Sequence, residues 1–424
     1  GFDKIQKLKS LHSNLEVLLA IPNIKTERRR KIISDLEKIK VAVRTMPSLN
    51  ELLSDKKKVT DIQELSINDI LPGARISNAK VKNAESKTFF ISGAGGSIGA
   101  EITRQLLSSN PGAIILFELS EYNLFNIERE CLAIKDSKNL DTEIIPILGD
   151  IRDRNNLEHV FQKYSVDQIY HAAAYKHVPI VENENNISKA AENNILGTYN
   201  LANSAVKHGV HSFVMISTDK AVRPTNIMGA TKRFAEIIIQ SINSEASNTK
   251  FSMVRFGNVI NSSGSVIPLF IDQISRGGPI TVTHKDVMRY FMTIPEASNL
   301  VLQAGEMSSG GEVFILDMGE QVKIFDLARK LIHLSGRNHA DGDEVDGIEI
   351  IEVGLRPGEK MFEELLISGS ELKTENPKIY KATESFIEPK ILKPLLIELK
   401  ESIVSFDNKK ILTLLSQHVE GFNR

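Results

Sequence analysis

Thr218, Asp219 and Lys220 place a hydroxyl, a carboxyl and an amine on consecutive residues. Side chains of these types can move protons to and from a substrate hydroxyl or an acidic carbon. A further lysine, Lys232, follows, and Met228 stands four residues before it. An unaided methionine cannot transfer a proton. We therefore expect either a site that binds its ligand without turnover or one in which Asp219 and Lys220 carry the acid and base work.

The electrostatics of this adjacent pair restrict its geometry. A direct ion pair would lower the pKa of Asp219 and raise that of Lys220, which is the opposite of what an acid and a base need at neutral pH. We therefore expect the two side chains to point apart. Removal from water shifts both pKa values in the useful direction, so a closed pocket is required. The alternative is a surface loop in which the aspartate caps a turn beside a solvated lysine.

A glycine-rich turn is the element that would place a cofactor beside these residues. Residues 88–92 predict a β-strand, and the pattern of apolar residues from 98 to 106 predicts a helix directly after the turn. Glycines allow the backbone to approach a pyrophosphate, and the free N–H groups of the helix start bind its negative charge. A plain strand-to-helix turn would also use one or two glycines. The predicted cofactor-binding residues in this turn are Gly93, Gly95, Gly96, Ser97, Ile98 and Gly99.

Acidic residues follow the next predicted strands. The strand 113–117 ends at Glu118, about 25 residues after Gly93, where an acid is expected to meet the adenosine ribose hydroxyls and to disfavour NADP. A solvated carboxylate at a strand end is the alternative for Glu118. The strand 143–148 leads to Asp150 and Ile151, which we expect to meet adenine, although Asp150 could equally cap a helix.

Two further strands are predicted at 168–174 and 211–217, with helical stretches between the strands. The alternation indicates an α/β fold with a doubly wound parallel sheet of Rossmann type. Because the carboxyl ends of such strands face the ligand crevice, Asp150, Tyr175, Lys176, His177 and the 217–220 run should gather on one rim. His177 either touches substrate or is a hydrogen-bonded loop histidine.

Composition excludes several classes of protein. The chain of 424 residues is 41% hydrophobic and 25% charged, which is typical of a soluble globular protein with two or more domains. The 52 basic and 54 acidic residues give no indication of a nucleic-acid partner. The single Cys131 excludes an intramolecular disulfide, favours a reducing compartment and is expected to be structural. No run approaches the roughly 18 apolar residues of a membrane helix, so this fragment is predicted to be soluble and cytoplasmic.

The chain is predicted to contain five regions. Residues 1–54 carry one β-α-β pattern, with strands at 16–22 and 41–46 and a helix that Thr26 could cap. This pattern is the remnant of an N-terminal Rossmann-like domain, because one such unit cannot cover both faces of its own sheet. A polar linker at 55–86 follows it. The other regions are a dinucleotide-binding Rossmann domain at 87–255, a smaller, mainly substrate-binding region at 256–383 with segments that return to the Rossmann domain, and helices at 384–424.

Several ordered motifs resemble one family. They are Ser217 to Asn226, Met228 to Lys232, Arg255 to Val259, Thr281 to His284, Arg289 to Thr293 and Arg356 to Lys360. Together they resemble the UDP-N-acetylglucosamine 4,6-dehydratases of the extended short-chain dehydrogenase/reductase family. More narrowly, the chain is similar to the large, membrane-anchored branch of CapD-like polysaccharide biosynthesis proteins, over about residues 15 to 380. Members of that branch have N-terminal membrane helices and a first nucleotide-like domain, which would explain the truncated N-terminal pattern.

The resemblance also explains Met228. In short-chain dehydrogenases a Tyr-x-x-x-Lys pair takes a hydroxyl proton while hydride leaves for NAD, and here Lys232 is present without the tyrosine. Members of the CapD-like branch typically carry Met at that position. The resemblance implies an internal redox cycle: hydride leaves sugar C4, a base removes the C5 hydrogen, an acid protonates the departing C6 hydroxyl, and hydride returns to C6.

The resemblance assigns a role to each catalytic residue. It implies Asp219 as the acid at C6, Lys220 as the base at C5, Thr218 at the C4 hydroxyl and Lys232 at the nicotinamide ribose. The group that accepts the C4 hydroxyl proton without a tyrosine is open, and Asp219 acting through Thr218 is our hypothesis. The cofactor is NAD, with Ala172 added to its site, and no metal site is assigned.

The resemblance also implies a UDP-sugar as substrate. Arginine suits a diphosphate because its planar fork donates two parallel hydrogen bonds, although Arg289 could equally form a structural ion pair. Glu359 is assigned to ribose hydroxyls, and residues 261–266 offer backbone N–H groups. The predicted substrate-binding residues are Lys176, His177, Asn258, Ser265, Val266, Arg289, Arg356 and Glu359.

Two rival functions stay open. A 4-epimerase of the same fold would return the hydride to C4 and needs no acid at C6. A catalytically silent NAD-binding regulator would agree with the missing tyrosine. The resemblance further implies a homo-oligomer, and for the full-length protein a location at the cytoplasmic face of the bacterial inner membrane.

Overall fold

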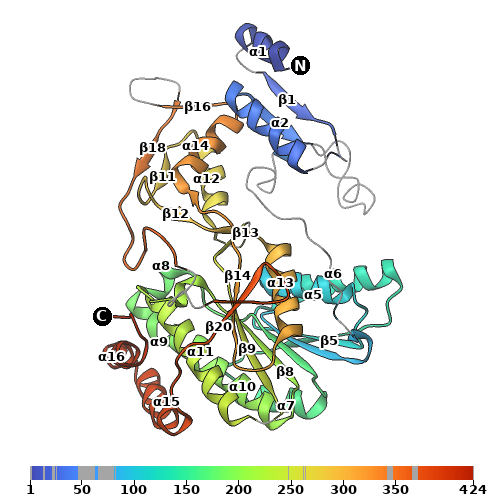
Figure 1. The fold of residues 1–424 in the computed structure, drawn as a ribbon, viewed down its shortest axis with the longest axis vertical. Coiled ribbons are helices and arrows are strands. Elements are labelled where there is room, and N and C mark those ends of the chain that lie inside the picture. Colours follow the sequence, from blue (N-terminus) through green and yellow to red (C-terminus); the bar gives the residue numbers. More distant parts are fainter. Residues whose placement is uncertain are drawn as a thin grey trace. The chain divides into compact units, whose positions relative to one another are not determined.

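The computed structural model describes most of the chain, in two compact units. The described residues are 2–12, 15–21, 24, 26–45, 63–64, 81, 83–246, 248–260, 262, 264–340, 347–364 and 371–423. Most of the predicted linker at 55–86 lies outside them. One unit contains residues 1–74, 258–293 and 320–355, and the other contains residues 75–257, 294–319 and 356–424. We describe each unit by itself (Figure 1).

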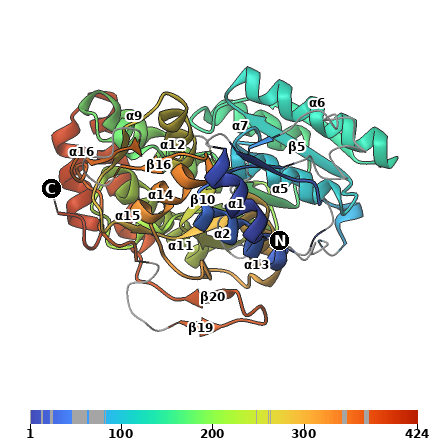
Figure 2. The same ribbon diagram turned by 90° about the horizontal axis from the view of Figure 1, so that it is seen from above.

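The larger unit is built on a nine-stranded sheet with the order β19-β20-β14-β9-β8-β7-β4-β5-β6. The strands from β14 to β6 are parallel, and β20 and β19 are added antiparallel at one edge (Figure 2). The bounds are β4 Thr88–Ser92, β5 Ala113–Glu118, β6 Glu143–Leu148, β7 Gln168–His171, β8 Ser212–Ile216, β9 Lys250–Arg255, β14 Val313–Leu316, β19 Leu372–Lys373 and β20 Ile379–Ala382. The predicted doubly wound parallel sheet is confirmed, and the predicted strands 88–92 and 143–148 match β4 and β6.

Burial explains why these segments are strands. Every residue of β5 is buried, as expected for a parallel strand that is covered on both faces. Aromatic side chains dominate the core beside the sheet, and Phe90 lies 5.2 Å from both Phe117 and Phe161 between ring centroids. Such rings bury large apolar areas and pack in tilted or offset pairs, which stabilises the sheet that carries the site.

Helices cover both faces of this sheet (Figure 1). On one side α5 packs against α6 and α13, and on the other α10 packs against α7 and α11. The bounds are α5 Ser97–Leu107, α6 Glu121–Lys138, α7 Arg154–Lys163, α10 Thr198–Lys207, α11 Ile227–Glu245 and α13 Ile294–Met307, with shorter pieces at η1 Ala84–Ser86, α8 Val178–Val181, η2 Glu184–Asn186, α9 Ile187–Ala191, η3 Glu192–Gly197 and η4 Asp219–Ala221.

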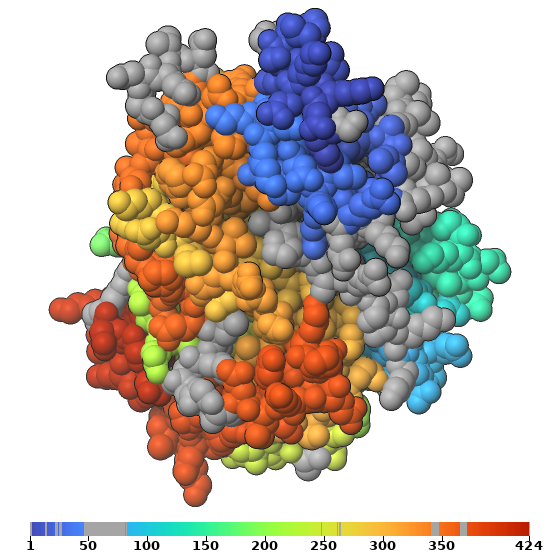
Figure 3. All heavy atoms as spheres, turned by 45° about the horizontal axis from the view of Figure 1, so that its top comes forward, coloured from blue at the N-terminus to red at the C-terminus, as the bar shows by residue number. Residues whose placement is uncertain are grey.

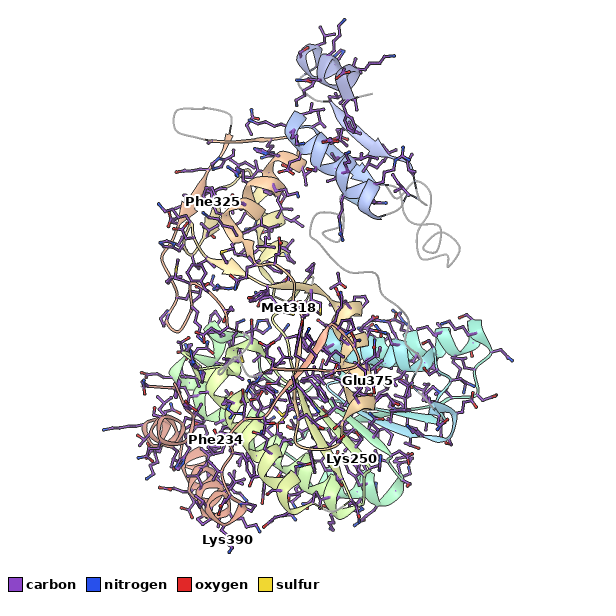
Figure 4. All side chains as sticks on the ribbon, viewed as in Figure 1. Phe234, Lys250, Met318, Phe325, Glu375 and Lys390 are labelled. Atoms are coloured by element: carbon purple, nitrogen blue, oxygen red, sulfur yellow. The ribbon has the colours of Figure 1, made fainter. Side chains whose placement is uncertain are left out.

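The predicted C-terminal helices are confirmed as α15 (Pro389–Val404) and α16 (Asn408–His418). They pack on α11 and α9 of the same unit. Their leucines join Phe234 of α11 (Figure 4) in one apolar cluster. One apolar face of these helices is therefore buried against the Rossmann helices of the same unit.

The smaller unit combines the N-terminal segment with parts of the C-terminal half. Its bounds are α1 Phe2–Leu11, β1 Glu16–Leu19, α2 Thr26–Ile39, β2 Ala42–Thr45, β3 Gln63–Glu64, β10 Asn258–Ile260, α12 Val266–Ser275, β11 Ile280–Val282, β12 Met288–Arg289, β13 Phe291–Thr293, β15 Val322–Lys323, α14 Ile324–Leu334, β16 Asn338–His339, β17 Gly347–Ile348 and β18 Ile350–Glu352. The predicted β-α-β pattern is confirmed: β1 and β2 are parallel and α2 connects them. Thr26 is the first residue of α2.

The N-terminal segment packs against α14 within this unit. Ile33 and Leu36 are buried, and α2 and β2 contact α14. A Cβ at Gly336, just after α14, would meet the Ala42 backbone nitrogen at 3.0 Å, so the chains approach closely there. In Figure 3 the N-terminal atoms lie against those of the later segment. Among the described residues, no helix has the length and apolar character needed to cross a bilayer.

Candidate active site

The glycine turn after β4 is a close-packed cradle. Gly93 has φ +67°, and a Cβ there would meet the backbone of Ala173 at 2.8 Å. A Cβ at Gly95 would meet Asn123 at 2.5 Å, and one at Gly99 would meet the carbonyl oxygen of Gly93 at 2.1 Å. Only glycine fits these positions, whereas a Cβ at Gly96 would meet nothing closer than 3.2 Å. The turn therefore leads into the N-terminus of α5 without side chains at these three positions. Ser97 and Ile98 begin the helix, and its first turn contains no acidic residue.

Glu118 is held beside this turn. It is buried at the end of β5, with Oε2 accepting a 2.9 Å hydrogen bond from the backbone N–H of Gly95 and Oε1 accepting one of 3.0 Å from Ser120. The solvated alternative is therefore wrong. Each carboxylate oxygen retains a lone pair, so Glu118 can still accept a hydroxyl hydrogen.

A buried hydrogen-bonded chain joins β4 to β7 below the turn. The Oγ of Ser92 lies 2.7 Å from Nδ1 of His171, and Nε2 of His171 lies 2.9 Å from Oγ1 of Thr198. Thr198 donates its own hydrogen to the carbonyl of Asn194, so His171 donates from Nε2 and accepts from Ser92. Burial, together with the charge of Lys232, lowers the pKa of His171 to about 3. The ring is a neutral structural element.

The end of β7 differs from the prediction. The strand ends at His171, because its neighbour β4 ends opposite it at Ser92 and the chain there turns away. Ala172 still donates a backbone hydrogen bond of 3.0 Å to Ser92, which places it next to the glycine cradle. The predicted strand to residue 174 is therefore too long.

Asp150 and Ile151 follow β6. Asp150 accepts hydrogen bonds from the Arg152 side chain and backbone. Burial opposes ionisation of Asp150, but these bonds dominate and lower its pKa. It is not a helix cap, since Asp153 caps α7. Ile151 is buried, and a Cβ at Gly197 would meet its side chain at 2.7 Å.

The Thr218-Asp219-Lys220 run forms a compact cluster. Oδ1 of Asp219 accepts hydrogen bonds from Oγ1 of Thr218 at 2.9 Å and Nζ of Lys220 at 3.1 Å. Nζ also lies 3.2 Å from Oε1 of Glu363. The side chains of Asp219, Lys220 and Glu363 are 0, 19 and 4% exposed. The surface-loop alternative is therefore wrong, and so is the prediction that Asp219 and Lys220 point apart.

Two features of this cluster could not be predicted from the sequence. Glu363 lies about 140 residues further along the chain, and the RPGEK motif just before it was the only signal near it. Oδ2 of Asp219 is buried and has no hydrogen-bond partner within the described residues. A buried carboxylate oxygen without a partner is costly, so this oxygen is available for a ligand hydroxyl.

Helix α11 carries Met228 and Lys232, one turn apart. Its start is fixed by Asn226, whose side chain accepts from Gly229, and by Glu182, whose Oε1 accepts from the Ile227 N–H at 2.7 Å. Met228 is buried in the apolar cluster with α15 and α16.

Lys232 is 5% exposed and forms no hydrogen bond or ion pair with the described residues. Burial lowers its pKa to about 8, against an opposing contribution from Glu236. A buried ammonium without a counter-ion is uncommon in a folded protein. Lys232 is therefore the residue of this site that most clearly lacks a partner and that a ligand would satisfy.

A buried ionic network supports β8 and β9 from below. Arg255 donates to Glu236 at 2.5 and 2.8 Å and to Glu384 at 2.5 and 2.7 Å. Arg233 pairs with both acids. Ser217, just before the Thr-Asp-Lys run, donates to Glu236 at 2.6 Å. Burial opposes ionisation of Glu236, but Arg255 outweighs it and lowers the Glu236 pKa to about 2.

The other predicted residues of the larger unit lie near the start of α11. Asn194 accepts from the Tyr175 N–H and donates to Thr231 of α11, which holds the loop that carries the exposed Lys176 and half-buried His177. His177 precedes α8. Burial, followed by the charge of Lys176, lowers the His177 pKa.

The turn from Arg356 to Glu359 is fastened to the same helix start. The carbonyl of Gly358 accepts from Oγ1 of Thr225 at 2.8 Å and from the Asn226 side chain at 3.1 Å. Glu359 accepts from the Arg356 backbone, while Arg356 and Glu359 are part of the larger unit. This fastening brings the segment that ends in Glu363 to Lys220.

The remaining predicted substrate residues belong to the smaller unit. Asn258 begins β10, and Arg289 is buried in β12 with a hydrogen bond to the Met288 carbonyl. Ser265 precedes Val266 at the start of α12, and its Oγ is buried with no hydrogen-bond partner among the described residues. A helix start with a spare hydroxyl suits a phosphate group. Asn261 lies outside the described residues.

Comparison with known proteins places this site in a family. The family model described as "Polysaccharide biosynthesis protein" matches residues 89–384. The chain belongs to this family. It is 42% identical over 410 residues to "Capsular polysaccharide biosynthesis protein CapD" of Staphylococcus aureus, which covers 95% of this chain and 65% of that protein. It is 43% identical over 383 residues to "Probable polysaccharide biosynthesis protein EpsC" of Bacillus subtilis (strain 168), covering 89% of this chain and 61% of that protein.

The predicted CapD-like family is thus confirmed, and the chain spans less than two thirds of the length of these two relatives. A "UDP-N-acetylglucosamine 4,6-dehydratase (inverting)" of Campylobacter jejuni is 32% identical over 287 residues, covering 66% of this chain and 78% of that protein. Among solved structures, Pen from Bacillus thuringiensis aligns with a TM-score of 0.62 at 33% identity, covering 74% of this chain and 98% of that chain.

Proposed function

We propose that this chain catalyses the NAD-dependent 4,6-dehydration of a UDP-sugar, UDP-N-acetylglucosamine, to UDP-2-acetamido-2,6-dideoxy-hexos-4-ulose for bacterial surface-glycan or glycoprotein synthesis. The observation that carries the proposal is the Asp219–Lys220 pair, in which Asp219 is buried and one of its carboxylate oxygens has no partner among the described residues. An acid for C6 and a base for C5 are the two groups that dehydration needs and that simple hydride transfer does not.

The residues present fit NAD. The glycine turn leads into the N-terminus of α5, whose first turn has no acidic residue, and this arrangement suits a pyrophosphate. Glu118 can accept ribose hydroxyls and would repel a 2′-phosphate. When bound, NAD accepts hydride from C4 and supplies it to C6. Lys232 gains in the bound ribose hydroxyls the hydrogen-bond acceptors that it lacks.

In this proposal the proton transfers are carried out by Thr218, Asp219 and Lys220. Thr218 donates to Asp219, and this hydrogen bond supports a role in which Thr218 passes the C4 hydroxyl proton to that carboxylate. Asp219 then returns the proton to the departing C6 hydroxyl. Lys220 takes the C5 hydrogen and later restores it, so neither residue is changed after a full cycle.

The substrate contacts remain proposals. In the larger unit Arg356 is assigned to the diphosphate and Glu359 to the ribose, and in the smaller unit Arg289 and the start of α12 at Ser265 and Val266 are assigned to phosphate. Lys176, His177 and Asn258 would contact the sugar nucleotide. In this proposal the enzyme acts as a homo-oligomer at the cytoplasmic face of the bacterial inner membrane.

One incubation tests the reaction. Purified protein with NAD and UDP-N-acetylglucosamine should yield a product lighter by one water by mass spectrometry. An unchanged mass with a new stereoisomer would show a 4-epimerase, and binding without product would show a silent dinucleotide-binding protein.

Two variants test the assigned roles. Asp219→Asn and Lys220→Met should each abolish turnover while NAD binding is retained, because neither residue belongs to the glycine cradle. Asp136→Asn and Lys400→Met change exposed residues of α6 and α15 in the same way and should keep wild-type rates. Wild-type rates in Asp219→Asn or Lys220→Met would refute the roles.

A further inference from the structure

Glu363 makes the acid–base cluster a set of three. It lies after the 356–359 turn, its side chain is 4% exposed, and its Oε1 is 3.2 Å from Nζ of Lys220. Lys220 thus lies between two buried carboxylates, with Asp219 at 3.1 Å. This arrangement favours the ammonium form of Lys220, which cannot take a hydrogen from C5. A base in this position needs somewhere to leave its proton.

Counting protons shows what the third member adds. At rest, one proton is on Lys220 and both carboxylates are ionised. With Asp219 as the sole acceptor, freeing the amine protonates Asp219, which can then no longer accept the C4 hydroxyl proton. If the proton moves to Glu363, the Lys220 Nζ–H bond breaks and a Glu363 Oε1–H bond forms. Lys220 is then a neutral amine and Asp219 is still a carboxylate, with no proton exchanged with solvent.

We propose that Glu363 is the positioning residue that holds Lys220 and takes its proton, so that Lys220 and Asp219 begin the reaction as two separate bases. The inference rests on the proposed dehydration and extends it. Glu363 acts through Lys220 and needs no contact with substrate.

Asp219 and Glu363 both lie within hydrogen-bonding distance of Nζ of Lys220, and the neighbouring charged groups have contacts of their own. On α11, which packs against η4, Arg233 and Glu236 are committed to the buried network, and Lys232 is a cation. Lys360 donates to the Val222 carbonyl at 2.9 Å. The other neighbouring charged groups are Glu182 just after α8, Arg223 in the η4 loop, and Arg356, Glu359 and Glu364 on the 356–364 segment.

The pH dependence of kcat tests the proposal. Internal transfer does not change the number of bound protons, so wild-type kcat should vary little between about pH 6.5 and 8.5. In Glu363→Gln the amine must lose its proton to solvent, so kcat should fall about 10- to 100-fold at pH 7 and recover about tenfold per pH unit as pH rises. KM should change little. Glu363→Asp should restore the flat profile.

A matched control is next in the chain. Glu364 is 41% exposed and pairs with Arg223 and Lys360, so Glu364→Gln should keep the wild-type profile. A Glu363→Gln enzyme with wild-type kcat, or with a loss that is the same at every pH, would overturn the proposal, because the second result indicates a merely structural role.

A second measurement does not depend on turnover. Competitive labelling of Lys220 by acetic anhydride, followed by mass spectrometry, reports its titration midpoint. In Glu363→Gln the midpoint should fall by about one pH unit or more, because one of two adjacent negative charges is removed. An unchanged midpoint would overturn the proposal. If the wild-type protein forms no product, the proposed function fails, and the labelling result still decides whether Glu363 controls the protonation of Lys220.

Discussion

Replacing Lys232 by methionine should stabilise the protein while removing its cofactor affinity. Burial lowers the Lys232 pKa to about 8, whereas a lysine in the unfolded chain titrates near 10.4. The folded state therefore bears a cost that is fully present below pH 8 and is relieved as pH rises towards 10.4. A pKa difference of roughly 2.5 corresponds to about 3 kcal/mol at pH 7. Lys232→Met should gain that amount in the free energy of unfolding.

Guanidinium unfolding without NAD, at pH 7 and at pH 9.5, measures this effect. The advantage of Lys232→Met over wild type should shrink from about 3 to about 1 kcal/mol between these pH values, because the unfolded wild-type chain binds more protons in that interval. The changing difference separates the charge effect from any packing gain, which is independent of pH. Lys400→Met removes an exposed lysine of α15 and should show no such trend.

If Lys232→Met is no more stable than wild type at pH 7, or if its advantage does not depend on pH, then the buried charge of Lys232 does not destabilise the fold.

The effect of Lys232→Met on cofactor affinity is measured by NAD titration. An ammonium that is satisfied only by a ligand should contribute to binding, so Lys232→Met should bind NAD at least tenfold more weakly. Wild-type affinity in this variant would show that Lys232 does not contact the cofactor.

Three further perturbations probe the same unit. Gly99→Ala should abolish NAD binding in a fluorescence titration, because its Cβ would meet the Gly93 carbonyl oxygen at 2.1 Å, and wild-type affinity would contradict this. His171 is neutral in the fold, and its pKa is lowered to about 3. The free energy of unfolding of the wild-type protein should therefore fall by about 2 kcal/mol through this group as the pH is lowered from 8 to 5. His171→Gln should not show this part of the decrease. Burial raises the pKa of the Cys131 thiol to about 12, so iodoacetamide at pH 8 should label it only after unfolding, and rapid labelling of the native protein would contradict this.

The main elements of the fold could be predicted because local patterns suffice for them. The β-type run 88–92 leads directly into the glycine turn and the helical pattern of α5, and this order of strand, turn and helix is visible within a few residues. The strand at 168–174 was predicted too long, because its length depends on where its neighbour ends. The register of a sheet is set between strands and is not visible within one.

The geometry of the site was harder to predict, because it depends on residues distant in sequence. We predicted that Asp219 and Lys220 point apart by considering the electrostatics of these two residues alone. The sequence does not show that Glu363 also contacts Lys220. The C-terminal apolar pattern predicted helices correctly, but amphipathicity does not name the surface that covers the apolar face. Lys232 was assigned by resemblance, and its lack of a partner emerges only from the packing of α11.

The structure shows the role of Met228, which stands where short-chain dehydrogenases carry a tyrosine. Met228 is buried in the apolar cluster of α11, α15 and α16, where it adds packing and no titrating group. In the proposed mechanism, proton transfer then depends on residues after β8, and these are held on two sides: the Asp219 N–H donates to the Phe256 carbonyl, and Ser217 donates to Glu236 of the buried network. A base and an acid one residue apart can work only if each keeps its own protonation state. In the proposed mechanism Glu363, the second carboxylate of the cluster, meets this condition, because it takes the proton of Lys220 and leaves Asp219 ionised.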